Sequence, residues 1–143
     1  MMKIYIFKFI LILIFANSSL MANTNTKFFQ EGLNLFNNKK YQKAKFKFEQ
    51  DIVFNPKSEN SYLYLAKIFN NLDKKELEEQ NLKTVILLNP KNEEAIYNLA
   101  RLKLESSDYK QSKELNNRLM NLCNEFCNKS QKLKIEIENL SKK

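Results

Sequence analysis

The sequence predicts an all-α fold, a right-handed solenoid of three helical hairpins followed by a C-terminal capping helix. The first observation is a 34-residue repeat, because Asn55-Pro56-Lys57 recurs as Asn89-Pro90-Lys91. The second is that the small residues Gly32, Ala66 and Ala100 are separated by the same interval. A repeat of this length is typical of stacked supersecondary units, which bury a core between neighbours. We expect a bulky side chain at these small positions to prevent two helices from crossing closely.

The segment 1–22 differs from the rest and is predicted to be a secretory signal peptide. Lys3 and Lys8 make its start basic, Phe9 to Phe15 is an uninterrupted apolar run, and small and polar residues lead to a cleavage site after Ala22. The alternative is a retained membrane anchor. The apolar stretch counted from Ile4 reaches only about 13 residues, short of the roughly 20 that a spanning helix needs. We therefore expect export to a bacterial periplasm; retention would anchor the chain in the inner membrane, facing the periplasm.

The first hairpin is expected within residues 25–56. Apolar residues keep helical spacing from Phe28 to Phe36, the polar run 37–40 interrupts them, and the helical spacing resumes at Tyr41. This second helix should end before Pro56, because the residue preceding a proline is disfavoured in the α region. Helix N-caps are expected at the repeat interval, at Thr24, Ser58 and Asn92.

The same pattern predicts a second hairpin within 59–90 and a third within 93–124. In the last segment, 128–143, Leu133, Ile137 and Leu140 keep helical spacing. This segment is predicted to be a helix that covers the open end of the stack, as repeat arrays require. Leu133, Ile135 and Ile137 also alternate as they would in a strand, so a strand is the alternative.

The three segments resemble tetratricopeptide repeats, which would occupy 23–127 and leave 128–143 as the capping helix. The third copy departs from the family pattern at Lys103, Asn116 and Asn124, and polar residues also replace apolar or small ones at Glu31, Asp51 and Glu78. The matching positions are Phe28, Gly32, Leu35, Ala44, Phe48, Phe54 and Pro56, then Tyr62, Leu65, Ala66, Phe69, Leu82, Leu88 and Pro90, then Ile96, Leu99, Ala100, Leu119 and Leu122.

The composition argues against catalysis. The chain has no His, which removes the usual general base, the Ser-His-acid arrangement and most zinc sites. Its single Gly leaves no glycine-rich loop to hold a phosphate. The net charge is +8, but the lysines are dispersed among glutamates, and export argues against a nucleic-acid partner. We therefore predict a protein that is not an enzyme, needs no cofactor or metal, and does not bind nucleic acid.

Cys123 and Cys127 are the one specific chemical pair in the sequence. An exported chain meets an oxidising compartment, so a disulfide is permitted. Cysteines four residues apart on a regular helix are too distant to bridge, so a disulfide requires a break in the helix there. A turn is expected in this stretch. The alternatives are two reduced cysteines packed on one helical face, or capture of a soft metal such as Cu(I).

The resemblance implies that the first helix of each hairpin lines a concave groove. Phe29, Leu63 and Tyr97 would stack there as an apolar ladder, and Lys67 and Arg101 would form a cationic step beside it. Alternatively, Phe29, Leu33 and Phe36 simply pack against the end of a short stack. The groove residues implied are Phe29, Leu33, Phe36, Leu63, Tyr64, Lys67, Asn70, Asn71, Tyr97, Asn98 and Arg101, with Gln30, Asn37, Leu104 and Glu105 beside them.

The function implied is a non-enzymatic protein–protein interaction module of the bacterial cell envelope, an adaptor or assembly factor that holds a peptide or helix of a partner protein. Aromatic and Arg side chains suit such contacts, since they dominate binding hot spots. Two alternatives remain: a self-associating subunit that forms a homo-oligomer, and a membrane-held tether with a retained leader. The clamp for a chaperone C-terminal carboxylate, known in one subfamily, is not reproduced. Its positions hold Phe29, Leu33, Tyr64, Glu94 and Asn98.

Overall fold

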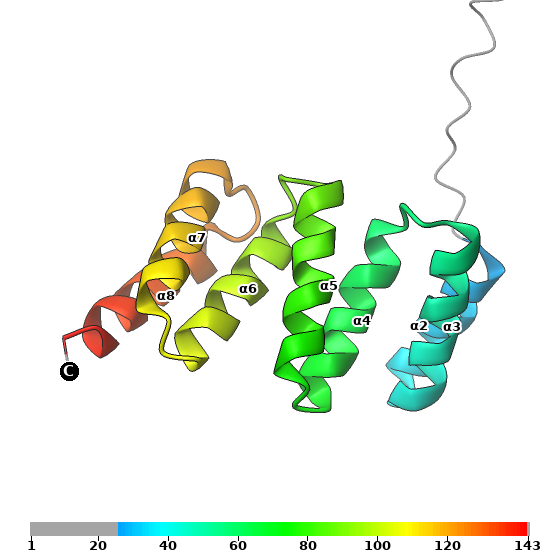
Figure 1. Ribbon diagram of the computed structural model, residues 1–143. Coiled ribbons are helices and arrows are strands. Elements are labelled where there is room, and N and C mark those ends of the chain that lie inside the picture. Colours follow the sequence, from blue (N-terminus) through cyan, green and yellow to red (C-terminus); the bar gives the residue numbers. More distant parts are fainter. Residues whose placement is uncertain (1–25, 143) are drawn as a thin grey trace, which may run out of the picture.

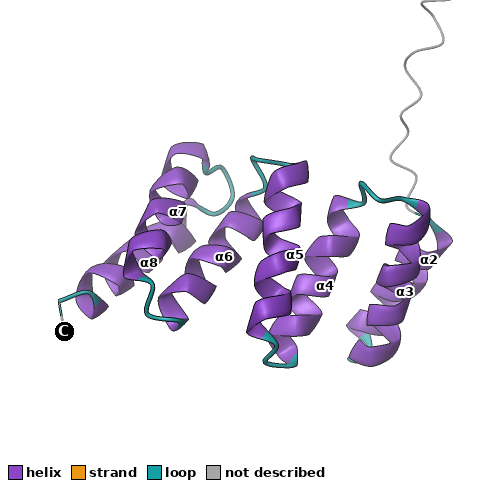
Figure 2. Cartoon of the chain, viewed as in Figure 1, coloured by secondary structure: helices purple, strands orange, loops and turns teal. Residues whose placement is uncertain are grey.

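The computed structural model describes residues 26–142, which form seven α-helices and no strand (Figures 1 and 2). The predicted signal peptide, 1–22, lies outside the described residues. None of the helices in the described range is long and apolar enough to cross a membrane. The helices are α2 Lys27–Asn37, α3 Tyr41–Phe54, α4 Glu59–Asn71, α5 Lys75–Leu88, α6 Glu93–Glu105, α7 Tyr109–Leu122 and α8 Cys127–Leu140.

The helices pack as three successive hairpins, α2 with α3, α4 with α5 and α6 with α7. The hairpins stack in chain order, since α3 contacts α4 and α5 contacts α6 (Figure 1). Helix α8 packs on α7 and also reaches α6. The predicted stack of three hairpins with a C-terminal helix is therefore confirmed, and the strand alternative for residues 133–137 is wrong.

The turn inside each hairpin has the same backbone conformation. Lys39, Asp73 and Ser107 are the three non-glycine residues with positive φ in residues 26–142, at 57°, 52° and 60°, and they are 34 positions apart. Each turn ends its first helix with a backbone hydrogen bond that spans six residues, a common left-handed helix ending. The donors and acceptors are Lys40 N to Leu35 O, Lys74 N to Phe69 O and Asp108 N to Lys103 O, at 2.9, 2.9 and 2.8 Å.

The repeated small residues lie where the helices of a pair cross. A Cβ atom on Gly32 would lie 2.8 Å from the ring of Phe48, a distance that real Cβ contacts do not show. Ala66 and Ala100 are fully buried at the corresponding places. The close crossing therefore explains why the sequence keeps small side chains at this position.

The helix starts agree with the predicted caps in part. Asn92 caps α6 by accepting a hydrogen bond from Ala95 N at 2.8 Å. Ser58 precedes α4 but makes no capping hydrogen bond. Thr24 lies outside the described residues, and α2 is capped instead by Thr26, whose hydroxyl accepts from Phe29 N at 3.2 Å.

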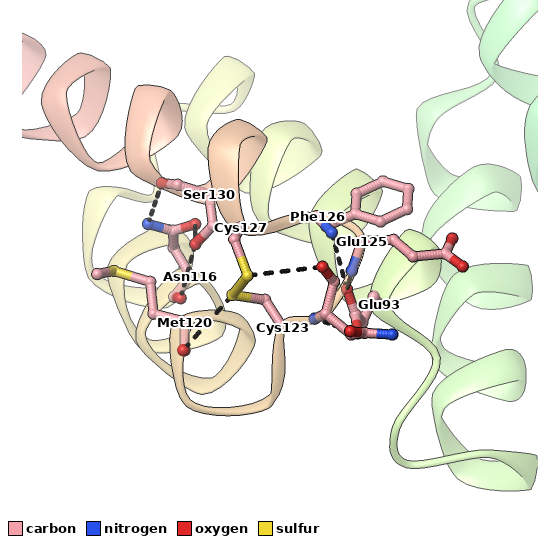
Figure 3. Close-up of a disulfide and its surroundings, with 9 residues drawn as sticks. Glu93, Asn116, Met120, Cys123, Glu125, Phe126, Cys127 and Ser130 are labelled. Atoms are coloured by element: carbon pink, nitrogen blue, oxygen red, sulfur yellow. Dashed lines mark hydrogen bonds between the residues drawn. A yellow bond between two sulfur atoms is a disulfide. The ribbon is translucent and has the colours of Figure 1, made fainter.

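Helix α8 covers the end of the third hairpin. Its Leu133 and Ile137 are buried and pack with Ala100 and Leu104 of α6. The Asn116 amide donates to Ser130 O at 3.0 Å, and the Ser130 hydroxyl donates to Asn116 Oδ1 at 2.9 Å (Figure 3). Asn116 departs from the repeat pattern because its neighbour is this capping helix rather than a fourth hairpin.

Candidate functional site: a groove pocket between the hairpins

A pocket with a cavity volume of about 300 Å³ opens between the first helices of the three hairpins and the start of α5. Most of its lining comes from α4 and α6, because the stack places the first helices of successive hairpins side by side. We call it the groove pocket. It is lined by Phe36, Ala66, Lys67, Asn70, Asn71, Glu78, Leu82, Glu94, Asn98, Arg101, Leu102 and Glu105.

Six of the residues that the sequence placed in the groove line this pocket. They combine one apolar wall with amide and cationic groups, which is the mixture that fixes the orientation of a bound segment. These residues are Phe36, Lys67, Asn70, Asn71, Asn98 and Arg101.

The expected apolar ladder does not form on the surface. Phe29 is only 5% exposed and packs 5.7 Å from the ring of Phe48, and Leu63 is only 6% exposed in the core between the second and third hairpins. Leu33 packs against the same core as Phe29. The alternative interpretation, packing within the stack, is therefore right for Phe29 and Leu33, because the first helix of a hairpin must also contact the preceding or following hairpin.

Tyr64 belongs to the wall behind the groove pocket rather than to its lining. Its ring stacks on Phe48 at 5.2 Å and meets Phe36 edge-on at 5.1 Å. Lys67 Nζ lies 4.7 Å from the centroid of the same ring, a cation–π contact. Tyr64 thus holds Phe36 and Lys67 in place, and a substitution at Tyr64 would disturb the core as well as the site.

Tyr97 is covered by the connection between α7 and α8. Its ring lies 5.6 Å from that of Phe126, and Lys129 Nζ lies 4.2 Å from the centroid of Phe126. Tyr97 also packs against the core of the third hairpin and α8. It therefore forms the end of the concave face and does not line the groove pocket.

The two groove cations are already paired. Lys67 Nζ lies 2.8 Å from Glu94, and the Arg101 guanidinium lies 3.0 Å from Glu105 on the same helix. The expected cationic step is thus balanced by carboxylates, and with Glu78 the pocket lining holds three acids against two cations. The Arg101–Glu105 pair follows the i, i+4 spacing, so the sequence carried a signal for it. The Lys67–Glu94 pair joins two hairpins and had no local signal.

Glu78, at the start of α5, is one of the lining residues that the sequence does not predict for the groove; the others are Ala66, Leu82, Glu94 and Leu102. Its side chain is only 4% exposed, and the Asn70 amide donates to both carboxylate oxygens at 3.1 and 3.2 Å. Burial raises the pKa of the Glu78 carboxyl above its ordinary value of 4.5, and nearby Glu105 acts in the same direction. Hydrogen bonding from Asn70 and the charge of Arg101 oppose this shift in pKa.

We expect Glu78→Gln to stabilise the fold at neutral pH. Because the folded state holds this carboxyl at a raised pKa, the folded state binds the proton more tightly than the unfolded chain does, and wild-type stability falls as the pH rises above 4.5. Gln does not ionise, so the variant does not lose stability in this way as the pH rises. Urea unfolding followed by circular dichroism should show the variant above wild type at pH 7.5 and level with it at pH 4. The matched control, Glu76→Gln on the exposed side of α5, should leave the free energy of unfolding unchanged at both pH values. If Glu78→Gln were less stable than wild type at pH 7.5, the argument from burial would be contradicted.

A disulfide between Cys123 and Cys127 closes the connection between α7 and α8 (Figure 3). The helix is broken as a bridge requires, since α7 ends at Leu122, α8 begins at Cys127, and the two Cα atoms are 5.1 Å apart. Neither cysteine in the structure is a free thiol. Residues 26–142 also hold no cluster of three or more Cys, Asp or Glu that could bind a metal ion.

The Glu93 carboxylate, at the start of α6, also stabilises the connection between α7 and α8. It accepts hydrogen bonds from Asn124 N at 2.7 Å, Glu125 N at 3.0 Å and Phe126 N at 2.9 Å (Figure 3). These backbone hydrogen bonds, above all that of Phe126, lower the pKa of Glu93. The disulfide and Glu93 together fix Phe126 against Tyr97, so the end of the concave face is rigidly built.

Comparison with known proteins identifies the fold. No protein-family model matches the sequence, and no curated protein is similar to it. The structure resembles the TPR2B domain of yeast Sti1 in its pHsp70 complex (TM-score 0.74, 13% identity, 80% of this chain and 95% of that one). It also resembles the type III secretion chaperone SycD of Yersinia enterocolitica in complex with a peptide of the translocator YopD (TM-score 0.74, 14% identity, 88% and 100%).

A third similar structure is the Sgt2 TPR domain from Aspergillus fumigatus, with a TM-score of 0.69, 20% identity, and coverage of 82% of this chain and 81% of that one. The chain therefore has the tetratricopeptide repeat fold, as its repeated residues predicted.

Proposed function

We propose that this chain is a protein-interaction module that holds a short segment of a partner protein in the groove pocket. The observation that carries the proposal is the pocket itself, which presents the ring of Phe36, the side chains of Asn70 and Asn98 and two ion pairs on the concave face of the stack. Structurally similar domains have been solved with peptides of partner proteins, including SycD with a YopD peptide. Such a function is binding alone and needs no catalytic side chain.

The chemistry of the lining indicates the kind of segment that fits. Asn98 offers its amide group and Asn70 its amide oxygen to the backbone of an extended segment, and the half-buried ring of Phe36 offers an apolar surface for one side chain. The three acids in the lining favour a partner residue with a positive charge over an acidic one. This preference contrasts with the Hsp90 peptide SRMEEVD bound to the first TPR of Spaghetti (RPAP3), in which three of the last four residues are acidic.

We further propose that the module works in the cell envelope as an adaptor or assembly factor. The support is the basic, apolar and small-residue order of residues 1–22, which is typical of a secretory leader. The disulfide between Cys123 and Cys127 is in keeping with an oxidising compartment.

Photo-crosslinking in intact cells tests the proposal. We expect p-benzoyl-phenylalanine in place of Asn98 to give an adduct of defined mass with another protein, because Asn98 lines the groove pocket. The same probe in place of Gln111, exposed on α7, serves as the matched control and should give no such adduct. Glu94→Gln combined with Glu105→Gln, which removes two of the three acids from the lining, should weaken the Asn98 adduct.

Two outcomes would overturn the proposal. Equal adducts from Asn98 and Gln111 would mean that the groove pocket is not selective. An adduct of twice the chain's mass from Asn98 alone would mean that the groove is filled by a second copy, which is the self-associating alternative.

A further inference from the structure

Glu78 is the acid of the groove pocket that has no cation in contact with it. Each of the other two acids in the lining forms an ion pair with a cation of the same lining. Glu78 takes part in none of the ion pairs of residues 26–142. Its carboxylate oxygens accept hydrogen bonds from the neutral amide of Asn70, at 3.1 and 3.2 Å. When ionised, Glu78 therefore brings a negative charge to the pocket that no side chain in the described part of the chain pairs.

The helical stack does not require an acid at this position. The equivalent residues of the first and third hairpins, 34 positions away, are Ala44 and Ser112, and both are fully buried. Glu78 is only 4% exposed, so folding removes its carboxyl group from water and raises its pKa. A buried acid that lines a cavity and replaces the small residue of the other repeats is typical of a binding site rather than of a scaffold.

The burial of Glu78 favours the binding of a cation. An ion pair that forms in a buried place usually costs the hydration of both charges. The Glu78 carboxylate has already lost its hydration on folding, so a cation that enters the pocket gives up only its own. Lys75 and Arg101 lie near enough to lower the pKa of Glu78, but neither forms an ion pair with it. Lys75 is exposed to solvent, and the Arg101 guanidinium is paired with Glu105.

The other groups of the lining suit an arginine side chain. A carboxylate accepts up to about four hydrogen bonds, so the amide of Asn70 leaves acceptor positions on Glu78 for the planar fork of a guanidinium. The half-buried ring of Phe36 offers a face on which a guanidinium and its apolar stem can pack. The cavity volume of about 300 Å³ is at the lower end of the range for ligand sites, which suits one long side chain.

We propose that the groove pocket binds one arginine side chain of the partner segment and that Glu78 is the residue that selects it. This inference rests on the proposed function, because the arginine belongs to the segment held in the groove. The guanidinium pairs with the Glu78 carboxylate, and Asn70 is a positioning residue that orients this carboxylate. An acidic side chain at the same place would meet a carboxylate without a counter-charge, so the pocket discriminates against it.

A synthetic peptide tests the proposal without knowledge of the natural partner. The probe is the acetylated and amidated pentapeptide Ala-Ala-Arg-Ala-Ala, and the matched probe carries citrulline in place of arginine, which has a similar shape but no charge. NMR titration of the isotope-labelled full chain follows the side-chain amide signals of Asn70 and Asn98, which line the pocket. We expect the arginine peptide to shift both signals along a saturating curve, and the citrulline peptide to shift neither at the same concentrations.

The Glu78→Gln variant should bind the arginine peptide at least about tenfold more weakly, because a hydrogen bond to a charged group is lost. Glu76→Gln, on the exposed side of α5, should bind it as wild type does. Equal shifts from the two peptides, no shift from the arginine peptide, or equal binding by wild type and Glu78→Gln would overturn the proposal. A lysine peptide that binds more tightly than the arginine peptide would overturn the choice of a guanidinium.

The photo-adduct at Asn98 separates a failure of this inference from a failure of the proposed function. We expect Glu78→Gln to weaken the adduct in intact cells, as it weakens the peptide. If the wild-type adduct forms and Glu78→Gln leaves it unchanged, a partner occupies the groove without an arginine at Glu78, and only this inference is wrong. If the arginine peptide binds in a Glu78-dependent way but the adducts from Asn98 and Gln111 are equal, the pocket selects arginine, and it is the proposed function that is wrong.

Discussion

Phe48→Ala is expected to lower the free energy of unfolding by about 3–5 kcal/mol, the usual cost of removing a buried aromatic ring. Phe48 has no exposed surface and lies at the centre of the first hairpin and its contact with the second. Its ring contacts Phe29 and stacks on Tyr64, and it fills the space that Gly32 leaves open. Urea unfolding of both proteins, followed by circular dichroism, measures the difference.

The control for this prediction lies on the same helix. Phe46 is two residues away and 58% exposed, so Phe46→Ala should change stability by no more than about 0.5 kcal/mol. Both variants lose the same atoms and have the same helix propensity at the changed position. Equal losses in the two variants would show that the first hairpin is not packed around Phe48.

The repeat interval was sufficient to predict the architecture. It locates the close crossing at Gly32, Ala66 and Ala100, and the helix endings before Pro56 and Pro90. Even the left-handed turns recur at that interval, at Lys39, Asp73 and Ser107. These features are local or are repeated between neighbours, so a single sequence contains them.

The polar residues that depart from the repeat pattern were not predicted, because each is explained by a partner distant in sequence. Lys103 pairs with Glu79 at 2.7 Å across two hairpins, and Asn116 bonds to Ser130 of the capping helix. Compared with the repeat pattern alone, such a residue is only a mismatch. In the structure it bonds to a specific partner, and that partner cannot be identified until it is known which helices pack together.

The groove was predicted only in part for a similar reason. Helical spacing identifies the first helix of each hairpin, but it does not say which of its residues the next hairpin covers, so Phe29 and Leu63 were assigned to the surface. Glu78 was missed because it comes from a second helix. A signal was present, since the first and third repeats hold Ala44 and Ser112 at the same position. An acid among small residues at a buried repeat position indicates a specific partner, here Asn70.

Asp51→Val is expected to destabilise the chain by about 1–3 kcal/mol, although it restores the apolar residue that the repeat interval predicts. Asp51 is 1% exposed and accepts hydrogen bonds from the hydroxyls of Thr26 and Ser61. Ser61 has no exposed surface, so Val at position 51 leaves a buried hydroxyl without its acceptor. Ser61→Ala alone should also destabilise, because it removes one of the two donors to a buried carboxylate. Unfolding in urea measures both single variants.

The double variant, Asp51→Val with Ser61→Ala, should recover most of either loss. One repeat later the same two positions are Val85 and Ala95, both fully buried, so the stack already contains this apolar pair at its next interface. Replacing both partners of a buried polar pair by apolar groups of fitting shape can be nearly neutral, whereas removing one partner is not. The double variant should therefore lose less unfolding free energy than the sum of the two single losses. The difference, which is the coupling energy, should be at least as large as the smaller of the two single losses. Simple addition of the two losses would mean that the first two hairpins are not joined through this pair.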